Sequence, residues 1–189
     1  MSRSSIINSA LILLLLISFW LLRSSQDETE TSATEEHVID YMLRDLSTTT
    51  FGQDGKPHRT LNTPELKHYQ DDDTSELLAP HIVAHQGAQP PWNIYSDTGW
   101  VSGDGELILL NGKVKMRREA FADNPSMNVD TKNLRVRPNE DYAETDERVK
   151  VRSSNGDRVD GLGAQVWLAE PMRLLLKSNS KAHYATKKP

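Results

Sequence analysis

Two histidines, His81 and His85, have the i, i+4 spacing that binds zinc when both lie on one helix. Pro80 before them, and Gly87 and Pro90 after them, leave room for barely one helical turn. On a strand the two rings lie ~13 Å apart along the chain. Zinc–nitrogen bonds are only ~2 Å long, so we predict no shared metal ion at these histidines.

A second candidate metal site is the acidic segment that begins Asp71-x-Asp73-x-Ser75, which resembles the start of a calcium-binding loop. Such a loop needs glycine at its sixth position and glutamate at its twelfth. This chain has Glu76 and Ile82 at those positions. We therefore predict a solvated turn, and no metal or cofactor is expected.

Signatures of catalysis are missing from the sequence. Cysteine is absent, which excludes disulfides, thiolate metal sites and a thiol nucleophile. The sequence has no G-x-S-x-G elbow and no phosphate-binding loop. Gly161-x-Gly163 lacks the rest of a dinucleotide fingerprint. We predict that the protein is not an enzyme; an enzyme with an unrecognised site is the minor alternative.

The charge of the chain argues against a nucleic-acid partner, because the formal net charge is −5. Residues 27–36 contain only acidic charges, and residues 171–189 contain only basic ones. The simple interpretation is two solvated tails. The alternative is that the two ends of the chain face different neighbours.

Residues 6–22 form an apolar run without a charge. As a helix this run is ~26 Å long, the lower limit for crossing a bilayer. A cleaved signal peptide is the alternative, but no small-x-small cleavage site follows. We predict an uncleaved inner-membrane anchor with residues 1–5 in the cytoplasm, a linker over 23–36 and a periplasmic domain over 37–189.

The predicted domain is built of strands, because apolar and polar residues alternate in short segments. Examples are the segments 113–117, 134–137 and 148–152. Leu66, Trp100 and Leu134 are evenly spaced along the chain, and Val166 follows at nearly the same interval. Turn-forming residues separate each of the first three from a second strand. This repeat predicts a row of hairpins that closes into a sandwich or an open roll.

A series of short motifs follows the apolar run. They are Phe51-Gly52-Gln53-Asp54-Gly55-Lys56-Pro57, Trp92-x-Ile94-x-Ser96-Asp97-x-Gly99, Ile108-x-Leu110-x-Gly112-x-Val114, Thr131-x-x-Leu134-x-Val136, Ala143-x-Thr145-Asp146-x-x-Val149 and Gly156-x4-Gly161-x-Gly163. The order of these motifs resembles the LptC family over nearly the whole chain. Residues 84–92, with Gln86-Gly87 and Pro90-Pro91, depart from the pattern and are expected to form a loop.

The resemblance implies an all-β, twisted open β-jellyroll that follows one transmembrane helix. It also implies lipopolysaccharide transport, with the acyl chains held in the apolar interior. One end of the sheet would dock on the transporter LptF/LptG, which works with the ATPase LptB and also contacts the anchor helix. The other end would dock on the periplasmic protein LptA. A membrane-anchored structural adaptor without a lipid site is the alternative.

The candidate lipid-binding residues are bulky apolar residues of the predicted strands, for which plain core packing is the simpler role. They are Leu66, Leu78, Ile82, Trp100, Leu109, Val114, Met116, Leu134, Val149, Leu162, Val166 and Leu176.

The candidate partner-binding residues lie in two turns and in a last strand predicted around 173–184. They are Gly55, Gly156, Leu174, Ala182 and Tyr184. The glycines match family glycines, but a hairpin turn alone also explains Gly55, and Tyr184 could simply belong to an exposed tail.

Overall fold

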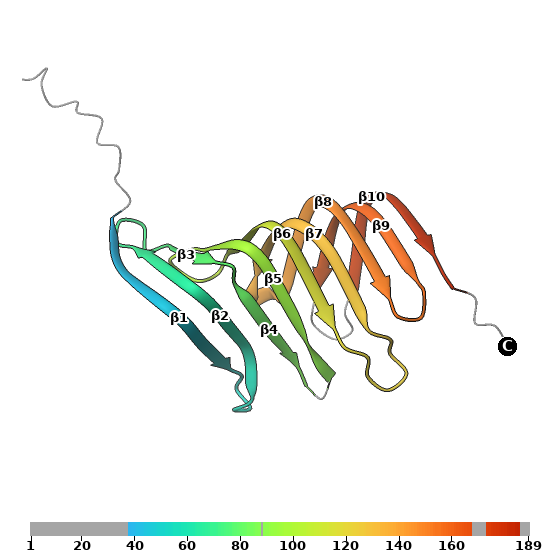
Figure 1. Cartoon of the computed structure of the whole chain (residues 1–189), viewed down its shortest axis with the longest axis horizontal. Coiled ribbons are helices and arrows are strands. Elements are labelled where there is room, and N and C mark those ends of the chain that lie inside the picture. Colours follow the sequence, from blue (N-terminus) through green and yellow to red (C-terminus); the bar gives the residue numbers. More distant parts are fainter. Residues whose placement is uncertain (1–37, 88, 168–172, 186–189) are drawn as a thin grey trace, which may run out of the picture. The chain divides into compact units, whose positions relative to one another are not determined.

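Ten antiparallel strands form one sheet in the computed structural model, which describes residues 38–87, 89–167 and 173–185 (Figure 1). The strands are β1 (Ile39–Phe51), β2 (Pro57–Tyr69), β3 (Ser75–Leu78), β4 (His81–Gln86), β5 (Gln89–Val101), β6 (Ile108–Arg118), β7 (Met127–Arg137), β8 (Tyr142–Ser153), β9 (Arg158–Trp167) and β10 (Arg173–His183). A short 3-10 helix, Pro138–Glu140, lies in the β7–β8 turn.

The spatial order of the strands follows the order of the chain, as expected for consecutive hairpins. The sheet runs β1-β2-β3-β5-β6-β7-β8-β9-β10, and β4 pairs with β2 and β5. β3 and β4 therefore occupy one place in the sheet, as two halves of a strand that is interrupted at Ala79 and Pro80. Within the described residues the sheet does not close, so β1 and β10 are its two edges.

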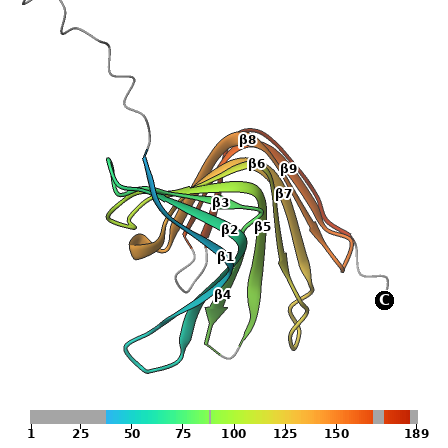
Figure 2. The same ribbon diagram turned by 60° about the vertical axis from the view of Figure 1, so that its left-hand side comes forward.

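Each long strand changes direction near its middle, and the sheet folds over along a crease (Figure 2). We call the half that contains β3 the first wall and the half that contains β4 the second wall. Register shifts at the crease occur in the β5–β6, β6–β7, β7–β8, β8–β9 and β9–β10 pairs. Such bulges bend a strand and increase its twist.

At the crease several residues adopt an unusual backbone conformation, and local hydrogen bonds replace those of the strand ladder. Gly112, Asn133 and Asn179 have positive φ angles of 76°, 47° and 49° on β6, β7 and β10. Glycine and asparagine tolerate this conformation better than other residues do. The amide oxygen of Asn133 accepts a hydrogen bond from Gly112 N at 3.1 Å, and Thr145 Oγ1 donates to Lys132 O at 2.8 Å. These bonds satisfy backbone groups that the bulges remove from the strand ladder.

The hydrophobic core lies between the two walls. The larger cluster joins Ile82, Trp92, Ile94, Leu110, Val114, Met116, Leu134 and Ala143. A smaller cluster toward β10 consists of Val149, Val151 and Ala164, with Leu176 packed against it. Between the bulges, successive side chains of each strand point alternately to this interior and to solvent, as period-two patterning predicts.

The predicted row of hairpins is confirmed, and so are turns at 71–73, 103–105 and 138–141. The loop expected over residues 84–92 is wrong in part. β4 extends to Gln86 and β5 begins at Gln89, so this segment is mostly strand. Pro90 and Pro91 are compatible with the strand because they lie at its start. The predicted anchor over 6–22 lies outside the described residues, and none of the described segments is a helix that could cross a membrane.

Candidate functional site

An apolar row crosses the second wall from one edge of the sheet to the other. Strand register places seven inward-facing residues side by side, one each from β2 and from β4 to β9. The row consists of Leu61, Ile82, Ile94, Met116, Val129, Val151 and Val159. It continues to Thr48 on β1 and to Ala182 on β10.

The first wall supplies the facing apolar surface. Leu66, Leu77, Gly99, Leu110 and Leu134 form its matching row from β2 to β7. Farther along, Ala164 on β9 pairs with Leu176 on β10. We call the space between the two rows the groove. Its residues come from all the long strands, so the whole folded sheet is needed to form it.

Two cavities lie in the groove. The first, near β2, has a volume of about 370 Å³ and is lined by residues of both walls, including Ile82, Ile94, Leu110 and Val136. Binding sites for small molecules usually have volumes of this order. The second, toward β10, has a volume of about 50 Å³ and is lined mainly by apolar side chains, including Met116, Val129 and Leu174.

Arg59 connects the two walls at the first cavity. It lies on β2, and its Nη2 donates a long hydrogen bond of 3.5 Å to Pro138 O in the β7–β8 turn. Burial lowers the pKa of Arg59 below its ordinary value, and the nearby charge of Asp141 partly opposes that shift. The groove therefore has a charged group at one mouth and a hydrocarbon interior.

Eight of the predicted lipid-binding residues face the groove or its crease. Ile82, Val114, Met116, Leu134 and Val149 are buried. Leu66, Val166 and Leu176 are half-buried. A role of these residues in binding lipid stays a prediction, because burial in the core alone explains their apolar character.

The other four predicted residues point out of the groove, and the interior position expected for them is wrong. Trp100 and Leu109 line a hollow on the outer face with Lys67 and Glu76. Leu78 and Leu162 are 49% and 41% exposed. The bulge between Ser96 and Thr98 reverses the alternation of β5, which turns Gly99 inward and Trp100 outward.

Several groove residues were not singled out from the sequence. Leu61, Val129 and Val151 belong to the apolar row, and Trp92 lines the second cavity. The alternation of Met127-x-Val129-x-Thr131 and Val149-x-Val151 is the signal that could have identified two of them. Trp92 follows two prolines and was assigned to the loop expected over 84–92, whereas it lies on β5.

The predicted partner-binding residues lie near both edges. Gly55 is in the β1–β2 turn and Gly156 in the β8–β9 turn, with φ angles of 74° and 96°. The predicted last strand is confirmed as β10, which is an edge of the sheet. Leu174 and Ala182 lie on this strand, and Tyr184, 72% exposed, follows it.

The other edge, β1, exposes a set of large apolar side chains. Val38, Ile39, Tyr41, Met42 and Leu43 are each at least 40% exposed. A long apolar edge strand favours pairing with another sheet unless it is shielded. Both edges therefore have the properties of docking strands.

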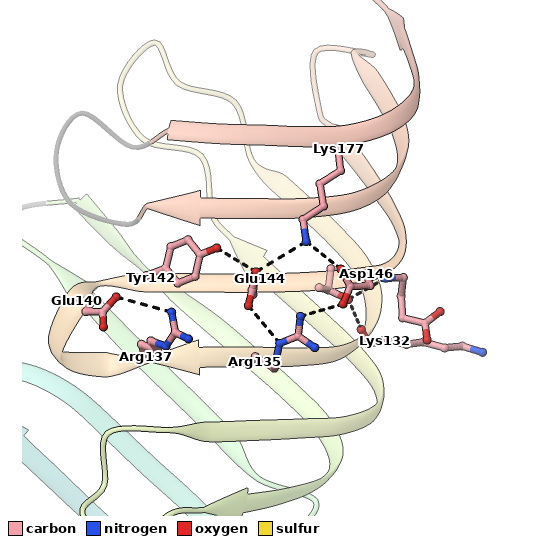
Figure 3. Close-up of polar contacts among 10 residues, drawn as sticks. Lys132, Arg135, Arg137, Glu140, Tyr142, Glu144, Asp146 and Lys177 are labelled. Atoms are coloured by element: carbon pink, nitrogen blue, oxygen red, sulfur yellow. Dashed lines mark hydrogen bonds and ion pairs between the residues drawn. The ribbon is translucent and has the colours of Figure 1, made fainter.

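An ion-pair cluster holds β10 to the outer face of the first wall (Figure 3). Lys177 Nζ of β10 lies 2.8 Å from Asp146 Oδ1 and 3.7 Å from Glu144 Oε2, both on β8. Arg135 of β7 contacts the same two carboxylates. The hydrogen bond from Lys177, together with Arg135, lowers the pKa of Asp146 to about 2.

Comparison with known proteins agrees with this architecture. The family model described as "Lipopolysaccharide-assembly, LptC-related" matches residues 9–185. No curated protein gives a significant match.

Among solved structures, the chain is similar to the crystal structure of LptH, the LptA homologous periplasmic component of the conserved lipopolysaccharide transport device from Pseudomonas aeruginosa. The TM-score is 0.52 at 8% sequence identity, over 68% of this chain and 95% of LptH. This likeness shows that the fold is shared. Because the family model covers nearly the whole chain, the protein belongs to the LptC family of lipopolysaccharide-assembly proteins.

Proposed function

We propose that the protein binds the acyl chains of lipopolysaccharide in the groove and passes the lipid from the inner-membrane transporter to LptA. The observation that carries this proposal is the apolar row, which runs through every position of the sheet from β2 to β9. An acyl chain that leaves water for such a surface gains ~0.8 kcal/mol for each buried methylene group. A continuous row offers similar contacts at each step along the sheet.

The two open edges support the second half of the proposal. A β-strand edge binds another sheet through backbone hydrogen bonds, which would join the groove to that of the neighbouring protein. We assign β1 to LptF/LptG and β10 to LptA. The segment over 6–22 is proposed to be a single inner-membrane span that contacts the transporter, with the N-terminus in the cytoplasm and the β-domain in the periplasm.

The energy for transport is proposed to come from the ATPase LptB, and the chain itself acts without catalysis. The protein then works as a passage whose direction is set by its two neighbours. This role needs a groove that binds lipid reversibly.

The proposal can be tested with two substitutions at adjacent positions of β2. Leu61 faces the groove and packs against the core cluster, whereas Thr60 pairs with Val83 on the outer face. We expect Leu61→Asn to weaken lipopolysaccharide binding by the purified full-length protein about tenfold or more, because a polar amide then interrupts the apolar row. Thr60→Asn should bind as the unmodified protein does.

Circular dichroism of both variants is needed to show that they fold. If folded Leu61→Asn protein binds lipopolysaccharide normally, the groove is not the binding site. The alternative of a structural adaptor without a lipid site would then be the better description.

A further inference from the structure

Two polar groups in the groove have no hydrogen-bond partner within the described residues. They are the indole Nε1–H of Trp92 and the hydroxyl Oγ1 of Thr131. Their residues are 2% and 8% exposed, so bulk solvent does not satisfy these groups. A buried polar group without a partner costs about 1–3 kcal/mol. Native structures contain few such groups, and each of them needs an explanation.

Both side chains line the second cavity, although they come from different strands. Trp92 lies on β5 and Thr131 on β7. Most of the other side chains around this cavity are hydrocarbon or thioether groups, such as Met116, Val129 and Leu134. Two groups without a partner in the described part of the chain therefore line the same, otherwise apolar cavity.

The chemistry of the two groups defines what could pair with them. An indole N–H only donates, and a hydroxyl both donates and accepts. A partner shared by the two must therefore present an acceptor oxygen. A plain hydrocarbon chain has none, whereas a hydroxyl or an ester carbonyl supplies one.

We propose that Trp92 and Thr131 form a subsite for an acceptor oxygen that an acyl chain bears part-way along its length. This inference rests on the function proposed above, because it concerns a ligand held in the same groove. The subsite makes the groove selective: it favours chains substituted with a hydroxyl or an acyloxy group over unsubstituted chains. It also fixes how far the chain enters, since the oxygen must lie beside the two donors.

The cation next to the subsite indicates which way the chain enters. The guanidinium carbon of Arg118 lies 5.1 Å from the centroid of the Trp92 ring. Arg118 is half-buried near the end of β6, and its Nη2 contacts the sulfur of Met127 at 3.5 Å. A cation there favours an anionic or polar end of the ligand beside Trp92, with the hydrocarbon tail directed toward the crease.

The experiment compares three probes that differ only at one carbon: tetradecanoic acid, 3-hydroxytetradecanoic acid and 3-acetoxytetradecanoic acid. Each is titrated into the full-length protein in lipid nanodiscs. One hydrogen bond of ordinary strength corresponds to a preference of about two- to tenfold for the substituted acids. The hydroxy and acetoxy probes separate a preference for a hydroxyl from one for a carbonyl oxygen, and a preference for either supports the subsite.

Two variants test the residues. Thr131→Val keeps the shape and removes the hydroxyl, and Trp92→Phe removes the indole N–H. We expect each variant to lower the ratio of the affinity for the substituted acids to the affinity for tetradecanoic acid toward one. Thr63→Val is the matched control, because Thr63 is buried outside both cavities and its hydroxyl already has acceptors within hydrogen-bond distance, Glu65 O at 2.8 Å and Leu78 O at 2.7 Å.

A spectroscopic readout covers the case in which Trp92→Phe does not fold. The indole N–H proton resonance of Trp92 in the unmodified protein should move to lower field with a substituted acid and remain in place with tetradecanoic acid. Equal affinities for the three probes, or a preference that survives both variants, would overturn the subsite and indicate that water satisfies the two donors. If no probe binds at all, the proposed function fails together with the subsite.

Discussion

Single glycines decide the conformation of two turns, and their surroundings differ. Gly55 has φ of +74°, and a Cβ added there would meet nothing within 4 Å. Gly156 has φ of +96°, and its Cβ would lie 2.9 Å from Cβ of Ala185. Ala185 follows Tyr184 directly after β10, where we place the LptA contact. A side chain at Gly55 would only strain its turn, whereas a side chain at Gly156 would also displace the segment that follows β10.

We expect Gly55→Ala and Gly156→Ala each to lower the free energy of unfolding by about 1–2 kcal/mol, the cost of a left-handed conformation for an L-residue. Only Gly156→Ala should also weaken LptA binding, because Ala185 must move. Urea denaturation and co-purification with LptA measure the two effects. Equal LptA binding by both folded variants would remove Gly156 from the docking region.

His68 bonds two carboxylates and anchors the edge strand β1. Its Nδ1 lies 2.7 Å from Asp40 Oδ1 and its Nε2 lies 3.0 Å from Asp73 Oδ1. Both contacts are satisfied at once when both ring nitrogens donate, as in the protonated ring. The hydrogen bond to Asp40 is the main cause that raises the pKa of His68 above 6.5.

A raised pKa means that this stabilisation is fully present below pH 6.5 and is lost as the pH rises through the raised value. We expect the thermal unfolding midpoint to fall across that range in the unmodified protein. The unfolding midpoint of the Asp40→Asn variant should fall less over the same pH range, because a neutral amide does not stabilise the protonated His68 ring. Parallel pH profiles for the two proteins would show that the pair does not control stability.

Also at the scale of single residues, the alternation of apolar and polar side chains could not show which face of the sheet Trp100 occupies. Ile94 and Ser96 face inward, and counting by two along β5 predicts the same for Trp100. One bulge residue at the crease reverses the count, and its position depends on pairing with β6. Leu109 and Leu110 are equally apolar neighbours, so the sequence did not reveal which of them is buried.

At the scale of elements, the long strands bend at the crease, and the hydrogen bonds of Thr145 stabilise the bend between β7 and β8. Thr145 on β8 is 1% exposed, and its hydroxyl donates to Lys132 O and accepts from Glu147 N at 3.1 Å. Its role differs from that of Thr131, whose hydroxyl is unpaired within the described residues. Two buried threonines on neighbouring strands thus make opposite contributions to stability.

We expect Thr145→Val to lower the free energy of unfolding by about 1–3 kcal/mol, because it leaves a carbonyl and an N–H without their partner. Thr131→Val should be neutral or stabilising, since it removes a group without a partner. Urea denaturation of both variants tests this contrast. Equal losses of stability in the two variants would show that the hydrogen bonds of Thr145 do not stabilise the crease.

The last strand is the element that we connect with LptA. Truncation after Pro171 removes β10 together with Lys177, which holds it to Asp146 and Glu144. We expect the truncated protein to remain in the membrane with its transporter and to lose capture of LptA, because its docking edge is gone. Loss of Leu176 should also reduce stability, so circular dichroism must accompany the pull-down. Capture at the normal level by a folded truncation would place the docking edge elsewhere.

At the scale of the whole molecule, the even spacing of Leu66, Trp100 and Leu134 predicted the row of hairpins because each hairpin has its own turn residues. This repeat could not predict the fold of the sheet into two walls, since that depends on bulges in several strand pairs together. Nor could it show that the apolar row stays in register from β2 to β9. That continuity arises only from the assembled sheet.

Photocrosslinking from adjacent residues at both ends of the row tests the groove most directly. A photoreactive amino acid is placed at Leu61 of β2 or Val159 of β9, which face the interior, and at the neighbours Thr60 or Arg158, which face outward. In living cells we expect lipopolysaccharide adducts from both interior positions and from neither neighbour. Adducts from Thr60 and Arg158 at the levels of Leu61 and Val159, or from none of the four, would contradict the account.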